Sequence, residues 1–355
     1  MTAMSKTATH MLRVAPQPGF ISLPIFRALS RTSRSSRQRA NQEWHQARNC
    51  ASDSQHKFSL AEEIKQATRE GRRFRFDKSL LTEAEKHMLR LRSKSIPLVA
   101  DSEPLEILFE DDTFLVVNKP PFLKMHPSHR FEGGSVLNRA IGYLGYPPRL
   151  LHRLDMHTTG VVVLSKTKEV CQPIMEQFMQ GLVKKEYLCV VDGCWSQQPG
   201  SSFVVDAPIQ RAHIKYVREI GESKEDSKPA RTIYTILDKS ESKQMMLLRA
   251  APQTGRTHQI RVHAASQSLP IIGDDLYNPK EHAMYSSYEE INAAARDETL
   301  GKYGDGNPLR KGLKLHAWTI SFENPLNSEP LTFSAAPPTH MSNLFEWCGM
   351  SAPER

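Results

Sequence analysis

Two short polar runs, about a hundred residues apart, hold most of the side chains in this chain that could do chemistry. The first, residues 152–160, places Asp155 two positions after Arg153 and follows it with small polar residues and a glycine. It leads directly into the apolar residues 161–164, which predicts that Asp155 lies where a loop enters a strand and can project into a cleft. The second run, residues 254–263, contains two arginines and two histidines. We interpret the two runs as halves of one site.

Asp155 is the candidate catalytic residue. A carboxylate can act as a nucleophile or a base without a metal if it is held ionised and oriented. A nearby guanidinium favours the anion and its planar fork fixes the plane of the carboxylate. Arg256 and Arg261 are the guanidinium candidates of the second run. An Asp–Arg pair is often only a structural ion pair, but His152 and Arg153 beside the carboxylate favour a functional site.

The second run is expected to form a helix over residues 258–267. On such a helix His258 and Arg261 share one face, because they are three residues apart. Thr257 is the candidate N-cap, and Gly255 would allow a tight entry into the helix.

Other chemistries match the sequence poorly. His152 and His157 are five residues apart, as are His258 and His263, whereas a helical zinc pair needs a spacing of four and an intervening glutamate. The chain has no Gly-x-Ser-x-Gly elbow, no Gly-x-x-x-x-Gly-Lys loop and no Gly-x-Gly-x-x-Gly turn. We therefore expect no metal and no cofactor.

The net charge of +8 comes mostly from the N-terminal segment. Residues 1–42 contain seven of the 47 basic residues and no acidic one, which leaves 40 basic against 39 acidic residues in the remainder. An Arg-rich, Ser/Thr-rich, acid-free leader is typical of an organelle-import presequence and predicts the mitochondrial matrix. The alternative is a disordered basic N-terminus. No run of 18 apolar residues occurs, so we expect no membrane span.

The hydrophobic pattern predicts an α+β fold around a mixed, largely antiparallel sheet with flanking helices and loops. The expected domains are a basic leader and linker (1–57), a helical extension (58–100), a catalytic domain (104–345) and a tail (346–355). In the extension, a Thr-x-x-Glu capping box begins at Thr82, and residues 72–76 alternate basic and aromatic side chains. Such an alternation can contact nucleic acid but is more often a solvated face. The polar segment 280–311 is expected to be a surface insertion. Strands are expected at 114–118, 160–165, 186–191, 232–237, 245–250 and 313–322, and a further helix at 171–181.

Over residues 104–340 the sequence resembles the RluA-like family of RNA pseudouridine synthases. Five blocks match in the correct order, which makes accidental similarity improbable. The blocks are Val117-Asn118-Lys119-Pro120 with His126-Pro127; His152-Arg153-Leu154-Asp155 with Thr158-Thr159-Gly160; Lys185-Glu186-Tyr187; residues 254–263 with Gly273-Asp274 and Tyr277; and Leu315-His316-Ala317.

The resemblance implies a cofactor-free isomerisation of uridine in rRNA or tRNA. Asp155 would start the reaction, Arg261 would pair with it, and Tyr187 would stack on the target uracil. Arg153 would occupy the space left by the flipped nucleotide, and the further RNA-contact candidates are His152, Arg256 and His258. A base must leave its stack before it can be isomerised, which agrees with these roles. RNA is the expected partner of a monomeric enzyme.

The chain departs from the family at two positions. Thr159 stands where relatives often have Ser, and Phe122 stands where they usually have Gly, so we expect a changed turn after Pro121. No S4-type RNA-binding module is evident before residue 100. Two other classes of function remain open: a non-catalytic RNA-binding or ribosome-assembly factor, and an aspartate-dependent hydrolase, which would need a second carboxylate near Asp155.

Overall fold

The computed structural model describes residues 11–13, 98–128, 132–214, 216–221, 226–279 and 312–353. Every helix and strand named below belongs to the larger of two compact units, which comprises residues 1–18, 100–127 and 133–355. Most of the predicted leader and extension lie outside the described residues, including the capping box at Thr82 and the basic–aromatic residues 72–76. The predicted insertion at 280–311 lies outside them as well.

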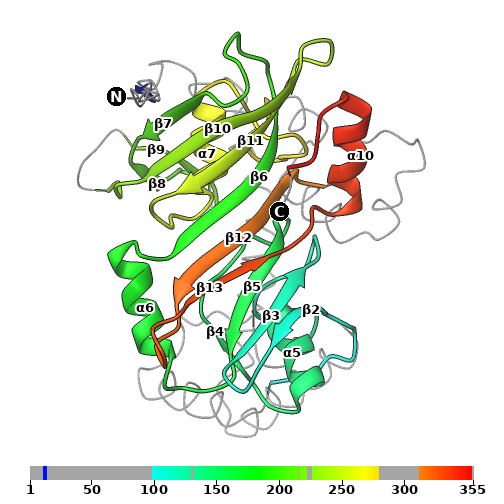
Figure 1. Ribbon diagram of the computed structural model, residues 1–355, viewed down its shortest axis with the longest axis vertical. Helices are drawn as coiled ribbons and strands as arrows, with labels where there is room; N and C mark the ends of the chain where they lie inside the picture. The colour runs from blue at the N-terminus through cyan, green and yellow to red at the C-terminus, as the bar shows by residue number, and fades with distance from the viewer. Residues whose placement is uncertain are drawn as a thin grey trace, which may run out of the picture. The chain divides into compact units, whose positions relative to one another are not determined.

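An eleven-stranded sheet forms the centre of the unit (Figure 1), and the strand order along its main path is β1-β7-β10-β11-β6-β12-β5-β3-β2. Only β5 with β12 and β1 with β7 pair in parallel among the described strands, so the predicted α+β class is confirmed. The strands of the sheet are β1 (Met11–Arg13), β2 (Glu106–Glu110), β3 (Phe114–Lys119), β4 (Arg149–Leu150), β5 (Thr159–Ser165), β6 (Lys184–Asp192), β7 (Ser202–Asp206), β10 (Arg231–Ser240), β11 (Met245–Pro252), β12 (Leu315–Glu323) and β13 (Pro330–Ser334).

Four described helices and one small hairpin accompany this sheet. The hairpin pairs β8 with β9 in antiparallel fashion. The elements are β8 (Ile209–Arg211), β9 (Arg218–Ile220), α5 (Val136–Leu144), α6 (Cys171–Gln180), α7 (Gln259–Ser266) and α10 (Thr339–Cys348).

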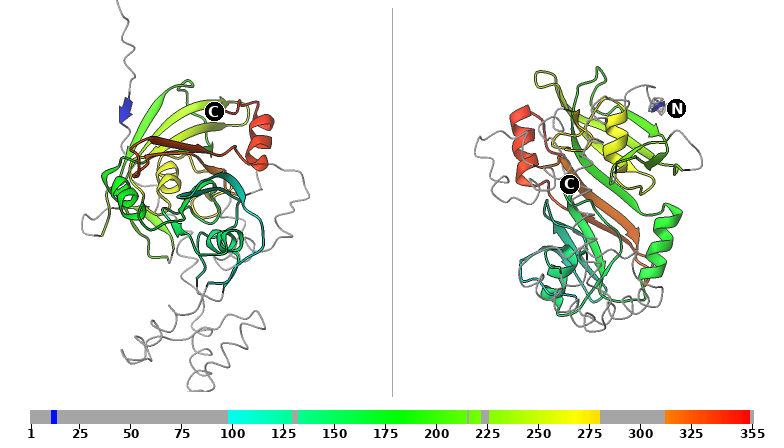
Figure 2. Two further views of the ribbon diagram at one scale, coloured as in Figure 1. Left: turned by 60° about the horizontal axis from the view of Figure 1, so that its bottom comes forward. Right: turned by 180° about the vertical axis from the view of Figure 1, so that it is seen from behind.

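Strand β6 supplies both hydrophobic cores of its half of the sheet. Its side chains alternate between the two faces because a strand has a period of two residues. Cys189 and Val191 belong to the cluster that includes side chains of α7, whereas Leu188 and Val190 pack with side chains of α10. Figure 2 shows from behind how α7 covers one face beside β10 and β11. The helix that carries the second polar run is therefore fixed against the strands on which the site is built.

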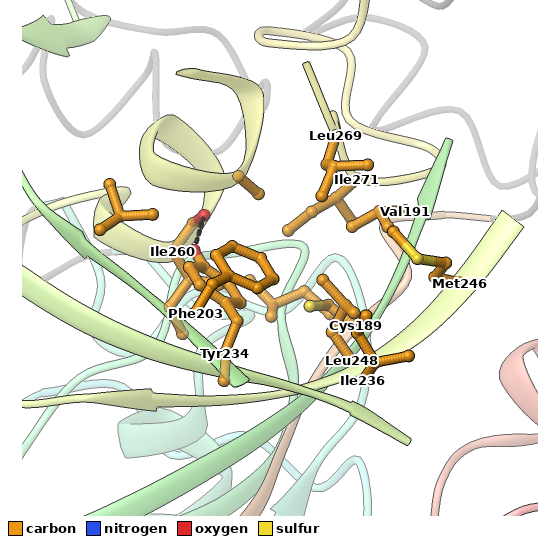
Figure 3. Close-up of a cluster of buried hydrophobic side chains, with 14 of the residues drawn as sticks. Cys189, Val191, Phe203, Tyr234, Ile236, Met246, Leu248, Ile260, Leu269 and Ile271 are labelled. Carbon is orange, nitrogen blue, oxygen red and sulfur yellow. Dashed lines mark hydrogen bonds between the residues drawn. The ribbon is translucent and has the colours of Figure 1, made fainter. Parts of the chain in front are cut away.

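The cluster under α7 is tied to the helix backbone by one hydrogen bond. Tyr234 is fully buried, and its hydroxyl donates to the backbone carbonyl of Ile260 at 2.8 Å (Figure 3). Its ring stacks on Phe203, with 5.0 Å between the ring centroids. The start of α7 is thus held by a buried polar contact within an otherwise apolar core.

Strand β5 is buried on both faces, as its run of apolar residues predicted. Val161 and Val163 pack with Ile174 of α6. Val162 and Leu164 point the other way and pack against α5. A strand held from both sides gives the preceding loop, which contains Asp155, a rigid base.

Gly160 allows β5 to approach β12. Its φ is 111°, a conformation that L side chains rarely adopt, and a Cβ atom there would lie 2.1 Å from the carbonyl oxygen of Ala317. The parallel pairing of β5 with β12 matches Gly160 with Ala317. Any larger residue would push these two strands apart next to the catalytic loop.

The start of α7 differs from the prediction. The N-cap is His258 and not Thr257, because His258 takes a left-handed conformation (φ 58°) and the helix begins at Gln259. Gly255 does not adopt a left-handed conformation, so it is not the residue that allows the turn. Instead, the Gln259 side chain accepts a hydrogen bond from the backbone N–H of Arg256 at 3.0 Å. This contact closes the turn that precedes the helix, and the helix itself has no side-chain cap.

The packed core continues past residue 345. Helix α10 ends at Cys348, and both Cys348 and Met350 are buried in the cluster that contains Leu188. None of the helices in the described residues has the length and apolar character needed to cross a membrane.

Candidate active site

The two polar runs meet at one pocket with a volume of about 820 Å³. Strand β6 and helix α6 complete its walls. All seven residues that the sequence proposed for the site line this pocket: His152, Arg153, Asp155, Tyr187, Arg256, His258 and Arg261.

Asp155 lies in the loop between β4 and β5. Its side chain is 28% exposed, so it is open to a substrate in the pocket. The backbone carbonyl of Asp155 accepts a hydrogen bond from the N–H of Thr158 at 3.2 Å, and the neighbouring Leu154 is buried in the core beside α5. The loop is therefore closed by its own backbone and anchored by an apolar side chain.

Arg261 lies within ion-pair distance of three carboxylates, Asp155, Asp274 and Asp275, and bonds mainly to the fully buried Asp274. Its Nη1 atom is 3.5 Å from Asp155. Its Nε and Nη2 atoms each donate to Asp274 at 2.8 Å. The Asp274 carboxylate also accepts hydrogen bonds from the backbone N–H groups of Leu276 and Tyr277. Asp274 thus fixes the plane of the guanidinium and leaves Nη1 directed at Asp155.

The electrostatics of this pair keep both groups charged. Burial alone would raise the pKa of Asp274, but the charge and hydrogen bonds of Arg261 outweigh it and hold that pKa below its ordinary value. Burial likewise works against the charged form of Arg261, and Asp274 more than compensates by raising its pKa. Sequence analysis recognised Asp274 only as part of a matching block and missed this function. The one indication was an acidic residue placed shortly after the arginine-bearing helix.

His258 connects Asp155 with Tyr277. Its Nδ1 atom is 2.8 Å from the Tyr277 hydroxyl oxygen, and its Nε2 atom is 3.8 Å from the Asp155 carboxylate. The Tyr277 oxygen also accepts a hydrogen bond from the backbone N–H of Arg218. Burial, assisted by the charge of Arg261, lowers the pKa of His258 to about 4. The imidazole is therefore neutral near pH 7.

Tyr187 projects from β6 into the same pocket. Its side chain is half-buried and packs against the clusters on both sides of the site. Burial and the nearby charge of Asp155 raise the pKa of its hydroxyl well above the ordinary value, so the phenol is protonated. A neutral, rigidly held ring beside the carboxylate is suited to stacking on a nucleobase.

Lys119 supports the loop that contains Asp155, and it was not predicted as a site residue. The side chain is fully buried at the end of β3, and its amine donates to the backbone carbonyls of Pro120 and Met156, each at 2.8 Å. Burial lowers the pKa of Lys119 to about 7, and the charge of Asp155 opposes this effect. Because Met156 directly follows Asp155, this amine holds the backbone next to the carboxylate.

Cationic side chains dominate the charged lining of the pocket. Among the described lining residues, the cations are Arg153, Lys185, Arg256 and Arg261, and the one carboxylate is Asp155. Arg153 is exposed, and so is Arg256, whose Nε donates to the carbonyl of Pro229 at 2.9 Å. This balance favours an anionic ligand such as a phosphodiester backbone.

His152 is used differently from the other predicted residues. Its Nε2 atom accepts a hydrogen bond from the backbone N–H of Val163 at 3.0 Å. Burial, followed by the charge of Lys185, lowers the pKa of His152 to about 4, so the ring is neutral. The structure therefore places His152 in the wall of the pocket, where it braces β5. Among the residues that the structure describes, no group of three or more potential metal ligands comes together.

Phe122 takes the conformation that glycine would provide at its position. Its φ is 61°, and its ring lies 5.3 Å from the ring of His157, in the catalytic loop. The turn after Pro121 therefore accommodates the large side chain in a left-handed conformation, and 42% of Phe122 remains exposed.

Comparisons with known proteins identify the family of the chain. Residues 113–266 match the family model described as RNA pseudouridylate synthase. The chain is 33% identical to ribosomal large subunit pseudouridine synthase C of Haemophilus influenzae over 251 residues, which cover 69% of this chain and 68% of that protein. It is also 33% identical to ribosomal large subunit pseudouridine synthase D of Nitrosomonas europaea over 252 residues, which cover 70% of this chain and 66% of that protein.

A solved structure shares the fold. Human RNA pseudouridylate synthase domain containing 4 superposes with a TM-score of 0.52 and 22% identity, and the match covers 77% of this chain and all of that one. The sequence relatives show that the chain belongs to the RluA-like family of RNA pseudouridine synthases, which are isomerases that act on RNA.

Proposed function

We propose that this enzyme converts specific uridines of rRNA or tRNA to pseudouridine in mitochondria, with Asp155 as the catalytic carboxylate. The observation that carries the proposal is the position of Asp155 in a cationic pocket, 3.5 Å from Arg261 and lined also by Tyr187. The names of the relatives, large subunit synthases C and D, support ribosomal RNA as the first substrate to test.

The geometry suits the steps of this isomerisation. The bond between N1 of uracil and C1′ of the ribose breaks, the base rotates, and C5 joins C1′. Overall a proton leaves C5 and N1 gains one, so the product is an isomer of uridine. Asp155 is open to the pocket and would attack or stabilise the sugar or the base, while Arg261, 3.5 Å away, would orient it. Tyr187 would hold the extruded uracil during its rotation, and the exposed Arg153 would fill the vacated stack.

The mitochondrial part of the proposal rests on the leader. Residues 1–42 are rich in arginine and contain no acidic residue. A fluorescent fusion of the full chain should accumulate in mitochondria, and the same fusion without residues 1–42 should remain in the cytosol. An unchanged mitochondrial signal after the deletion would contradict the import function of the leader.

The isomerase is tested by mapping pseudouridine across all RNAs of cells that lack the protein. Re-expression of the wild-type chain should restore a defined set of sites, whereas Asp155→Asn should not restore them. Asp206→Asn is a matched control, because Asp206 forms an exposed ion pair with Arg231. If Asp155→Asn restored the modified sites, the carboxylate mechanism would be wrong. If it restored growth without the sites, the essential activity would be RNA binding or ribosome assembly.

A further inference from the structure

Two exposed methionines border the active-site pocket. Met175 and Met179 of α6 are 47% and 76% exposed, and both line the pocket. Leu182, directly after the helix, is 57% exposed. Large apolar side chains at the rim of a polar site indicate that something covers them during function.

The fold does not need these methionines. Ile174 of α6 is fully buried in the hydrophobic cluster that also contains Val161 and Val163, and Phe178 packs against this cluster. Met175 and Met179 are four residues apart and therefore adjacent on one side of the helix. That side is directed to the pocket, so the two thioethers form a continuous apolar ridge along its rim.

The surroundings of the ridge indicate what would cover it. Arg153, Lys185 and Arg256 line the same pocket and provide positive charge, and Asp155 is its single lining carboxylate. An unpaired RNA strand complements both the cations and the ridge. Its phosphates attract the cations, and its bases present apolar faces to the methionines. Apolar side chains, including methionine, are known to contact unstacked bases, and the flexible thioether adapts to irregular shapes.

We propose that the Met175–Met179 ridge is a docking surface for the unpaired bases that flank the target uridine. This inference deepens the proposed function and rests on the assignment of the pocket to RNA. The ridge supplies contact with base faces, while the arginines and Lys185 hold the backbone. It would therefore favour uridines in single-stranded or loop segments, where the flanking bases are free to leave their stack.

The test compares two short labelled RNAs with the same number of phosphates. One is an oligouridylate, and the other is the same strand in which the bases beside a central uridine are replaced by abasic riboses. Wild-type protein at low ionic strength should bind the first more tightly. Met175→Ala combined with Met179→Ala should reduce this preference about tenfold, the expected loss for removing buried methionine contacts. Alanine favours helix formation, so α6 should persist in the variant.

The control variant is Leu326→Ala, which removes an exposed aliphatic side chain (61%) that is not part of the pocket lining. It should bind both RNAs as the wild type does. The proposal is overturned if the wild type shows no preference for the complete strand, if the methionine variant keeps the preference, or if Leu326→Ala loses it equally. Asp155→Asn should retain the preference and lose isomerisation, which separates failure of the ridge from failure of the proposed catalytic site.

Discussion

Arg261 makes both of its shortest contacts with Asp274, at 2.8 Å each, although it also lies 3.5 Å from the Asp155 carboxylate. A fully buried carboxylate thus holds the arginine, and the arginine in turn orients the exposed carboxylate. Asp155 shares its partner and is not itself clamped by a two-point ion pair. It therefore remains available to react while its orientation is fixed.

Asp274→Asn should reduce both stability and activity. The substitution leaves the Arg261 charge buried without its main partner, and breaking a buried pair in this way typically costs about 3–5 kcal/mol. Urea unfolding should show a loss of this size, and isomerase assays of the folded fraction should show a lower kcat. Asp275→Asn is the matched control, since Asp275 lies 3.7 Å from Arg261 and is more exposed. Equal losses in both variants would contradict the special function of Asp274.

Replacing His258 with glycine should lower activity without lowering stability. Its left-handed conformation (φ 58°) strains a residue that has a Cβ atom, by about 1 kcal/mol or more. His258→Gly should remove this strain but also the imidazole between Tyr277 and Asp155, so kcat should fall about tenfold or more while stability is retained. His258→Ala should lower both the stability and kcat. Ser328→Gly, at another left-handed position (φ 59°), should gain stability with unchanged activity. Full activity in His258→Gly would exclude a catalytic function for the imidazole.

Tyr187 should act through its ring. Tyr187→Phe keeps the aromatic face and should retain binding of substrate RNA. Tyr187→Ala should weaken the free energy of RNA binding by about 1–3 kcal/mol, the usual contribution of one base–aromatic stack. Steady-state kinetics on an RNA identified by pseudouridine mapping would measure both. If Tyr187→Phe were as inactive as Tyr187→Ala, the hydroxyl rather than the stack would be the essential group.

Lys119→Met should loosen the catalytic loop. The change leaves the partly buried carbonyls of Pro120 and Met156 without their donor, at a cost of up to about 1–3 kcal/mol for each unsatisfied group. Both the free energy of unfolding and kcat should fall, because Met156 adjoins Asp155. Lys166→Met removes a lysine that pairs with Glu110 near the surface and should cause a smaller loss of stability with normal kcat. Normal kcat in Lys119→Met would show that the loop does not depend on this amine.

Stability should decrease in mild acid because of buried neutral histidines. Burial lowers the pKa of His263 and His316 to about 4 in the folded protein, whereas an unfolded histidine titrates near pH 6.5. Below about pH 6.5 the unfolded state binds protons that the folded state does not. The free energy of unfolding should therefore fall by about 1.4 kcal/mol per pH unit for each such histidine, down to about pH 4.

Urea unfolding between about pH 7 and about pH 5 measures this slope. His316→Gln should flatten it by the share of one histidine, even though it removes hydrogen bonds to Thr159 and Ala335. A slope that is the same in the wild type and in His316→Gln would contradict the assignment of buried neutral imidazoles.

The sequence predicted most strands of the sheet because their apolar runs were long and clearly bounded. Strand β5 was expected at 160–165 and spans Thr159–Ser165, and α6 was expected at 171–181 and spans Cys171–Gln180. Helices α5 and α10 were not predicted. In α5 the cap is a serine, Ser135, whose side chain accepts from Asn138 in a short segment between glycines, so the helical period was hard to recognise.

The site residues were predicted by resemblance, and their connections were not. No pattern in the sequence shows that Asp274 takes the main bonds of Arg261 or that Lys119 reaches Met156, since both contacts depend on how distant segments pack. The predicted cap of α7 was wrong because His258, in a left-handed conformation, takes the N-cap position and the helix begins at Gln259.

The position of β12 in the sheet affects when the active site can assemble during synthesis of the chain. Strands β5 and β6 are successive in the sequence, yet β12 lies between them. The carboxylate loop that leads into β5 and the tyrosine of β6 therefore obtain their final spacing only when residues 315–323 have been inserted. A nascent chain still lacking this segment has every catalytic side chain but no assembled active site. We therefore expect RNA modification only after residues 315–323 have been synthesised and have closed this long-range pairing.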